Sequence, residues 1–261
     1  MATAIAPSLE WQQASPDHYV RGPMASTEGR LIYAIGDIHG RYDLLKSLLA
    51  EIAADADAAA RGDRPLLVFL GDYIDRGPDS AQVIEALLWL ERRSPFEVKL
   101  LRGNHEQCLL DFLDDPIGGA AWLRFGGVET LASYGVSEPA DEGDMIAARD
   151  DLLDRLPAAH LKLLERMPLC LSIGDFVFAH AGIRPGVRLA DPRAEDLLWI
   201  REQFLESRDL HPKVVVHGHS WASDEPEIRA NRIGLDTGAF TTDRLTAARL
   251  YDGSVRIVRA S

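Results

Sequence analysis

The chain has 261 residues, of which 46% are hydrophobic, so it can bury a substantial core within one large domain. Its formal net charge of −13 at pH 7 disfavours nucleic acid and anionic membranes as partners, and an anionic substrate would need a local cluster of positive charge. The first residues lack the pattern of a signal peptide, no apolar run reaches the ~18 to 20 residues that span a bilayer, and the two cysteines form no CxxC pair, which together predict a cytoplasmic protein.

Residues 1–29 mix proline, serine and glutamine with a few large side chains and show no clear period. We therefore predict an N-terminal arm over residues 1–29, followed by a single domain over residues 30–261. Within that domain, apolar runs at 31–35, 66–70 and 98–101 are predicted strands, separated by amphipathic helical patterns. This βαβαβ order predicts neighbouring parallel strands.

The second half of the chain changes in character. Residues 106–167 are predicted to be mostly helical, with a glycine-marked break in the sequence RFGG at 124–127. After Pro168, short strands are predicted at 170–173, 176–179, 214–216, 233–235, 245–250 and 255–258. A helix over 193–205 is expected between the second and third of these strands.

Polar clusters directly follow the first three predicted strands: GDIHG at 36–40, GDYIDRG at 71–77 and GNHE at 103–106. The carboxyl ends of neighbouring parallel strands meet at one edge of a sheet, so these clusters should converge. Later strands end in HAG at 180–182 and HGHS at 217–220. Buried carboxylates and imidazoles are costly without a compensating partner. These oxygen and nitrogen donors are too many for one tetrahedral site, which favours two metal ions acting on a phosphate ester.

These blocks, together with LDTGA at 235–239, resemble the phosphoprotein phosphatase branch of the metallophosphoesterases, particularly its compact bacterial and phage-type serine/threonine phosphatases. The resemblance covers residues 31–258. It implies an α/β fold in which two mixed β-sheets form a central sandwich flanked by helices, with a helical insertion. It also implies two divalent metal ions, with manganese as the first expectation and iron or zinc as alternatives.

The resemblance further implies which residues hold the metals. One metal would be held by Asp37 and His39, and Asp72 would bridge both metals. The ligands implied for the second metal are Asn104, His180 and His219. His219 is favoured over His217, because the family's metal histidine precedes a serine or threonine. His217 is then expected either to support the site without binding metal or to be an ordinary core histidine.

The remaining roles concern the phosphate group. The resemblance implies that His105 protonates the leaving oxygen, that Asp75 orients His105, and that Arg76 and Arg201 grip the phosphoryl group. The reaction implied is direct attack by a hydroxide that bridges the two metals, without a phosphoenzyme. Arg184 has no matching family role and is interpreted as a solvated loop arginine.

Three functions remain open at this point. The first is a protein phosphatase acting on phosphoserine and phosphothreonine in phosphoproteins or phosphopeptides, with phosphotyrosine left open. The second is a symmetrical dinucleoside polyphosphate hydrolase, and the third is a catalytically silent interaction scaffold. Asp75 and Glu106 favour the first, since the polyphosphate group usually replaces both, and the complete ligand set disfavours a scaffold. The acidic stretch 137–151 would favour basic phosphopeptides if it bordered the site; otherwise it is a solvated face.

Overall fold

A computed structural model describes residues 9–13, 25–59 and 64–261 of the chain. Residues 1–8 and 14–24, which make up most of the predicted N-terminal arm, lie outside the described residues, as do residues 60–63. The proposed boundary between arm and domain at residue 29 therefore stays a prediction. None of the helices in the described parts of the chain is long and apolar enough to cross a membrane.

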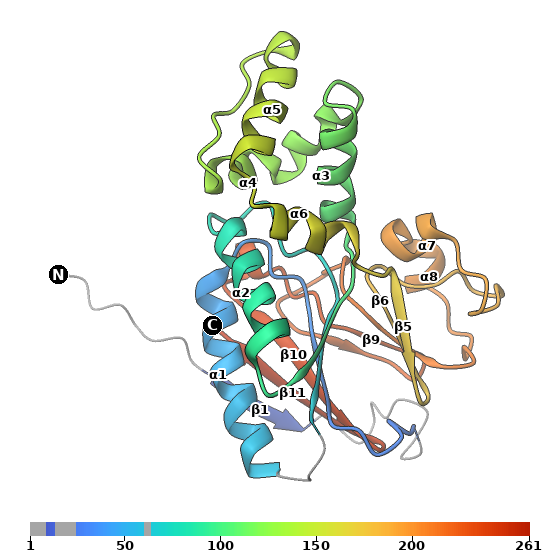
Figure 1. Cartoon of the computed structure of the whole chain (residues 1–261). Coiled ribbons are helices and arrows are strands. Elements are labelled where there is room, and N and C mark those ends of the chain that lie inside the picture. The colour runs from blue at the N-terminus through green and yellow to red at the C-terminus, as the bar shows by residue number, and fades with distance from the viewer. Residues whose placement is uncertain (1–8, 14–24, 60–63) are drawn as a thin grey trace.

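Two mixed β-sheets lie at the centre of the fold (Figure 1). The described strands of the first sheet follow the order β1-β11-β10-β2-β3-β4. Their bounds are Leu9–Gln13, Ser254–Ala260, Leu245–Tyr251, Ile32–Ile35, Leu66–Phe69 and Glu97–Leu100. The second sheet has the order β5-β6-β7-β9-β8, with bounds Cys170–Ile173, Phe176–Ala179, Val214–His217, Arg232–Gly234 and Glu227–Ile228. The predicted parallel pairing of β2 with β3 and of β3 with β4 is confirmed.

Three hydrophobic clusters show how the layers pack. The sheets face each other across one cluster, which includes Ile32 and Ala34 of β2 and Phe178 of β6. The alternate residues Tyr33 and Ile35 of β2 point the other way, into a cluster shared with the helices outside the first sheet. A third cluster joins β6 and β7 to helices outside the second sheet. The layers are therefore helix, sheet, sheet and helix, which is the sandwich implied by the sequence.

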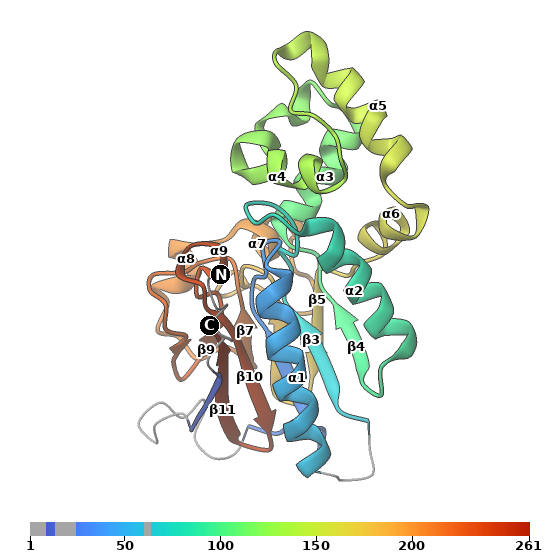
Figure 2. The same ribbon diagram turned by 90° about the vertical axis from the view of Figure 1, so that its left-hand side faces the viewer.

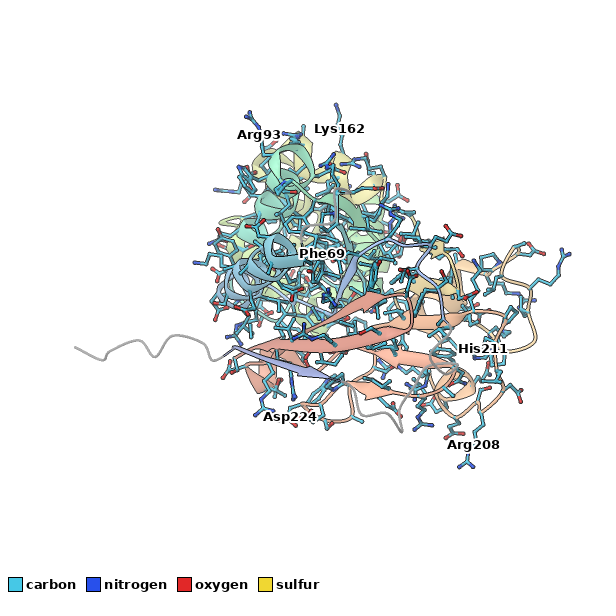
Figure 3. The ribbon with its side chains drawn as sticks, turned by 90° about the horizontal axis from the view of Figure 1, so that it is seen from below. Phe69, Arg93, Lys162, Arg208, His211 and Asp224 are labelled. Carbon is cyan, nitrogen blue, oxygen red and sulfur yellow. The ribbon has the colours of Figure 1, made fainter. Side chains whose placement is uncertain are left out.

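Helices cover the outer faces and form the insertion. Outside the first sheet lie α1 (Tyr42–Ala59) and α2 (Ser80–Arg93), and outside the second lie α7 (Ala194–Trp199) and α8 (Glu202–Leu205). The insertion contains α3 (Asn104–Asp114), α4 (Val128–Ser133), α5 (Met145–Arg155) and α6 (Ala158–Glu165), and it projects away from the sheets (Figure 2). Short helical turns occupy Gly118–Ala120, Leu123–Gly127, Glu142–Asp144 and α9 (Ala239–Thr242). Seen from below, Phe69 lies in the middle of the molecule, whereas Arg93, Lys162 and Arg208 extend from its edge (Figure 3).

Three elements differ from the sequence-based expectation. The prediction of a single helix over 193–205 is wrong. The segment forms two helices, α7 and α8, separated at Ile200 and Arg201, and Arg201 has non-helical φ and ψ angles of −129° and −108°. The strand β1 lies within the stretch for which no regular element was predicted, and it pairs antiparallel with β11. An edge strand is held by backbone hydrogen bonds along one side, so it needs no alternating apolar pattern. The two-residue strand β8 is too short to leave a pattern.

Candidate metal centre

The motifs predicted to converge do so at the carboxyl ends of the strands. The N–H groups of Ile38 and His39 donate to the Asp72 carbonyl over 3.0 and 2.9 Å, which joins the loops after β2 and β3. The N–H of Gly218 donates to the His180 carbonyl over 2.8 Å and joins the loops after β6 and β7. The His219 N–H, after β7, donates to Asp37 Oδ2, after β2, over 3.0 Å, so both sheets contribute loops to one site.

The loops of the site hold an unusual backbone conformation. Positive φ angles, from 46° to 73°, occur at His39, Asp72, Asp75, Arg76 and His219. Each such residue costs about 1–3 kcal/mol unless its surroundings fix it, and such strain clusters at functional sites. A buried carboxylate offsets part of this cost, since Glu106 accepts the N–H groups of Asp72, Tyr73 and Gly103 over 2.7 to 2.9 Å. Glu106 therefore holds the second motif against the third.

The first cluster of candidate ligands is buried around Asp72. The ligand atoms of His39, Asp72 and His105 lie within 4.8 Å of one another. Asp37, predicted to share a metal with His39, lies beside them and accepts the His219 N–H through Oδ2 over 3.0 Å, while its Oδ1 is buried with no hydrogen-bond partner among the described residues. Burial first, and then the neighbouring carboxylates of Asp236 and Asp72, raise the pKa of Asp37 well above its usual range. A cation would relieve this crowding of carboxylates.

Close packing also fixes Asp37. A Cβ at Gly218 would lie 1.9 Å from Asp37 Oδ1, so any side chain at position 218 would displace the carboxylate. The glycine of the HGHS motif is therefore required by the close approach of two loops rather than by a turn.

The second cluster lies on the other side of Asp72. Asn104 Oδ1 is 2.8 Å from His180 Nε2 and 2.9 Å from His219 Nδ1. His180 Nδ1 donates to the Leu70 carbonyl over 2.9 Å, so in the neutral ring the Nε2 lone pair faces the Asn104 oxygen. Burial lowers the pKa of His180 and lowers that of His219 to about 2, so both rings are neutral. A cation coordinated by both atoms would remove the repulsion between these two lone pairs.

The donor atoms around Asp72 fit bound metal ions. The Oδ1 of Asp37, unpaired among the described residues, and the neutral ring nitrogens of the site converge from both sides on the buried carboxylate of Asp72. His39 is likewise neutral, because burial lowers its pKa to about 3. Oxygen and imidazole donors suit Mn, Fe or Zn. The two clusters share Asp72, and this arrangement fits a dinuclear site.

His105 of the first cluster also forms a buried pair with Asp75. His105 Nδ1 lies 2.6 Å from Asp75 Oδ2. Asp75 also accepts hydrogen bonds from Trp122 Nε1 over 2.8 Å and from Thr130 Oγ1 over 2.6 Å. Burial opposes the charged ring, but Asp72 and Asp75 outweigh it and raise the pKa of His105. Trp122 and Thr130 come from the insertion, and sequence reasoning missed both because no motif marks them.

The two candidate phosphate arginines lie at different sides of the site. Arg76 donates to His39 Nε2 over 3.0 Å and to His105 Nε2 over 3.1 Å, so its guanidinium lies between the two rings. The backbone N–H of Arg76 donates to the Gly126 carbonyl. Gly126 has a φ of 105° and packs closely on Arg76, since an added Cβ at Gly126 would lie 2.6 Å from the Arg76 nitrogen. The predicted RFGG break thus packs on Arg76. Arg201 is exposed at the start of α8, close enough to lower the pKa of His219.

His217 and Arg184, for which no catalytic role was predicted, both form hydrogen bonds near the site. His217 accepts a hydrogen bond from the buried Arg232 through Nε2 over 3.2 Å, and its Nδ1 donates to the Gly218 carbonyl over 3.0 Å. It therefore braces the loop that carries His219. Arg184 donates from Nε to both carboxylate oxygens of Asp196 over 3.0 and 2.9 Å, which makes it an ion-paired loop residue.

We expect replacement of the two neighbouring histidines to separate their roles. His219→Ala should lower metal occupancy strongly, because it removes a candidate ligand atom 2.9 Å from Asn104 Oδ1. His217→Ala should lower metal affinity or activity by only about 10- to 100-fold, since it removes a brace. Metal content per chain, measured on both purified variants, distinguishes them, and the reverse ranking would exchange the assignments.

The acidic stretch 137–151 belongs to α5 and the loop before it. Its carboxylates at Glu138, Asp141, Asp144, Asp150 and Asp151 are exposed. Figures 1 and 2 show α5 in the part of the insertion that projects from the sheets, whereas the metal clusters lie at the strand ends. This position favours the interpretation as a solvated face, so we expect the stretch to contribute little to the selection of basic phosphopeptides.

Comparisons with known proteins agree with this geometry. Calcineurin-like phosphoesterase is the family description that matches residues 30–240. Serine/threonine-protein phosphatase 2 of Escherichia coli (strain K12) is 33% identical over 246 residues, covering 92% of this chain and 97% of that protein. A symmetrical bis(5'-nucleosyl)-tetraphosphatase of Legionella pneumophila (strain Lens) is 33% identical over 226 residues, covering 86% of this chain and 69% of that protein.

A solved structure shows the same fold. The crystal structure of a candidate diadenosine tetraphosphatase matches with a TM-score of 0.60 at 21% identity, covering 90% of this chain and 96% of that chain. The matched family region contains every motif from GDIHG to LDTGA, together with both histidine and aspartate clusters. The chain belongs to the calcineurin-like phosphoesterases and is a metal-dependent phosphoesterase.

Proposed function

We propose that this phosphoesterase is a serine/threonine protein phosphatase, which hydrolyses phosphomonoesters of serine and threonine. The observation that carries the proposal is the buried pair of His105 and Asp75. An alkoxide leaving group is very basic and needs a proton as the bond to phosphorus breaks, whereas the phosphate group that leaves a polyphosphate is weakly basic and leaves unaided. Asp75 and His105 are both buried, and Asp75 is held by three hydrogen bonds, from His105, Trp122 and Thr130.

The roles of the residues follow from their positions. Asp37, His39 and Asp72 would hold one cation, and the residues that would hold the other are Asp72, Asn104, His180 and His219. When bound, the two cations supply an activated water and neutralise charge on the phosphoryl group. Manganese is our first candidate for both sites, with iron or zinc as alternatives.

Orientation of the phosphoryl group and transfer of the proton are assigned to side chains that do not bind metal. Arg76 and Arg201 orient the phosphoryl oxygens from two sides. Once Arg76 turns from His105 Nε2 to the phosphoryl group, His105 would carry a proton on Nε2 and give it to the leaving oxygen, while Asp75 stabilises the charged ring through Nδ1.

A dinucleoside polyphosphate hydrolase is the second candidate. The Legionella relative named for this activity has the same identity, 33%, as the Escherichia coli phosphatase, although the match covers less of its length. Glu106 weighs for the protein phosphatase, because its longer side chain is what reaches the N–H groups of Asp72 and Tyr73. Aspartate, which the polyphosphate group usually has at this position, is one methylene shorter.

A substrate comparison on the metal-loaded enzyme tests the proposal. We expect kcat/KM for phosphoserine and phosphothreonine peptides to exceed that for diadenosine tetraphosphate by at least tenfold, with Mn²⁺, Fe²⁺ and Zn²⁺ each tried. The Asp75→Asn variant should narrow this difference, because it weakens the acid that only the peptides need. A clear preference of the wild-type enzyme for the dinucleotide would instead establish the second candidate.

A further inference from the structure

Two aromatic side chains lie beside the first metal cluster. Phe240, in α9 directly after the LDTGA motif, has its ring centre 4.6 Å from the guanidinium carbon of Arg76 and 5.3 Å from that of the His39 ring. Trp221, in the loop after β7, stands nearly perpendicular to Phe240, with ring centres 6.4 Å apart. The two rings come from α9 and from the loop after β7, and they form one aromatic corner next to a candidate phosphate arginine.

Trp221 is held in place but left open to solvent. Its indole packs against Gly238, where φ is 68° and an added Cβ would lie 2.8 Å from the indole Cδ2. One side of the ring is thus covered by backbone, yet 40% of the residue remains exposed. A large apolar ring fixed by the backbone and exposed beside a strongly polar site is suited to contact a ligand.

The corner is linked to the candidate acid His105 through Arg76. Arg76, which packs on Phe240, donates to His105 Nε2 over 3.1 Å, and the rings of His39 and His105 are 4.7 Å apart. In the proposed function, the atom that gives up the proton to the leaving oxygen is His105 Nε2. In this arrangement the group bonded to that oxygen would extend toward Phe240, with Trp221 beyond it.

We propose that Trp221 and Phe240 form a leaving-group subsite for a flat aromatic ring bonded directly to the phosphoryl oxygen, as in phosphotyrosine. The inference rests on the proposed protein phosphatase function and names the residues that would favour an aryl over an alkyl phosphomonoester. A phosphotyrosine ring can pack edge to face or offset on the two rings, whereas the side chains of phosphoserine and phosphothreonine have no face to offer. In a dinucleoside polyphosphate, ribose and further phosphate separate the base from the cleaved bond. The base would therefore lie beyond Phe240, which packs on Arg76.

Paired peptides that differ only in the phosphorylated residue test this subsite. The readout is the ratio of kcat/KM for the phosphotyrosine peptide to kcat/KM for the phosphoserine peptide, which cancels losses common to both. Trp221→Ala should lower this ratio by about 3- to 10-fold. Trp221→Phe keeps an aromatic face and should hold the ratio within about twofold of the wild type. Trp89→Ala is the matched control, since Trp89 is 57% exposed on α2 and lines a separate apolar groove of about 1000 Å³ between α1 and α2.

The outcomes separate this inference from the function on which it rests. An unchanged ratio in Trp221→Ala, with both peptides still hydrolysed, would overturn the subsite and leave the protein phosphatase intact. A loss in Trp221→Ala confined to diadenosine tetraphosphate would reassign the corner to a nucleobase and also overturn it. Wild-type enzyme that hydrolyses the dinucleotide and neither peptide would overturn the proposed function itself.

Discussion

Replacement of Asp72 by asparagine is expected to remove metal from both clusters and to lower kcat/KM by roughly 1000-fold or more, with the fold retained. The Asp72 carboxylate lies 3.6 Å from His39 Nε2 and 3.3 Å from His180 Nε2, one ring in each cluster. A neutral amide bridges two cations poorly, and each cation contributes several kcal/mol of charge stabilisation in the transition state. Metal content per chain and steady-state kinetics check the result.

The control for this variant is Asp114→Asn, which also removes one negative charge but does so at the exposed end of α3. It should bind metal and turn over substrate as the wild type does. Circular dichroism on both variants establishes that they fold. An Asp72→Asn enzyme with two tightly bound metals and near-normal turnover would show that Asp72 does not bridge the clusters.

The His105→Asn variant is expected to lose activity unequally on two kinds of substrate. Hydrolysis of an alkyl phosphate should fall by about 10²- to 10⁴-fold, because the leaving alkoxide is strongly basic and depends on the proton from His105. Hydrolysis of p-nitrophenyl phosphate should fall far less, since the nitrophenolate leaves without a proton. The measurement is kcat/KM for phosphoserine peptide and p-nitrophenyl phosphate on the same metal-loaded preparation.

A buried histidine outside the site provides the control. His160, in α6, lies 2.9 Å from the Tyr134 hydroxyl and 3.0 Å from a Glu85 oxygen, within the insertion and beside α2. His160→Asn should affect only the stability of the fold, so any loss of folded enzyme should lower kcat/KM for both substrates by the same factor. Equal losses on both substrates in His105→Asn would mean that His105 serves the metal cluster rather than the leaving group.

Much of the fold could be predicted because its pattern is local. Strands such as Leu66–Phe69 are buried on both faces, so they appear in the sequence as short, continuous apolar runs. The motif residues could be brought together for the same reason, since each follows a strand whose parallel neighbour was already expected. The break between α7 and α8 could not be predicted, because the apolar residues Leu197, Leu198 and Ile200 run up to it and the helical spacing resumes at Phe204 and Leu205.

The parts of the site that escaped prediction depend on contacts between distant segments. Trp122 is fully buried, and its sequence surroundings are those of an ordinary core aromatic. Only the path of the insertion brings its Nε1 within 2.8 Å of Asp75. Arg232 is similar, since a buried arginine that donates to His217 leaves no signal in a short strand. Asp236 lies within the LDTGA motif, but its closeness to Asp37 follows from the packing of Gly36, after β2, on Leu235, after β9: an added Cβ at Gly36 would lie 2.3 Å from the Leu235 carbonyl oxygen.

The most direct test of the dinuclear site is the number of divalent ions that restores activity to metal-stripped enzyme. Titration with Mn²⁺, followed by calorimetry and by hydrolysis of a phosphoserine peptide, should show two ions bound per chain and activity that rises with occupancy of both sites. The two clusters meet at one carboxylate, so binding at one should affect binding at the other. Full activity in the stripped enzyme, or full activity with a single bound ion per chain, would contradict the dinuclear centre.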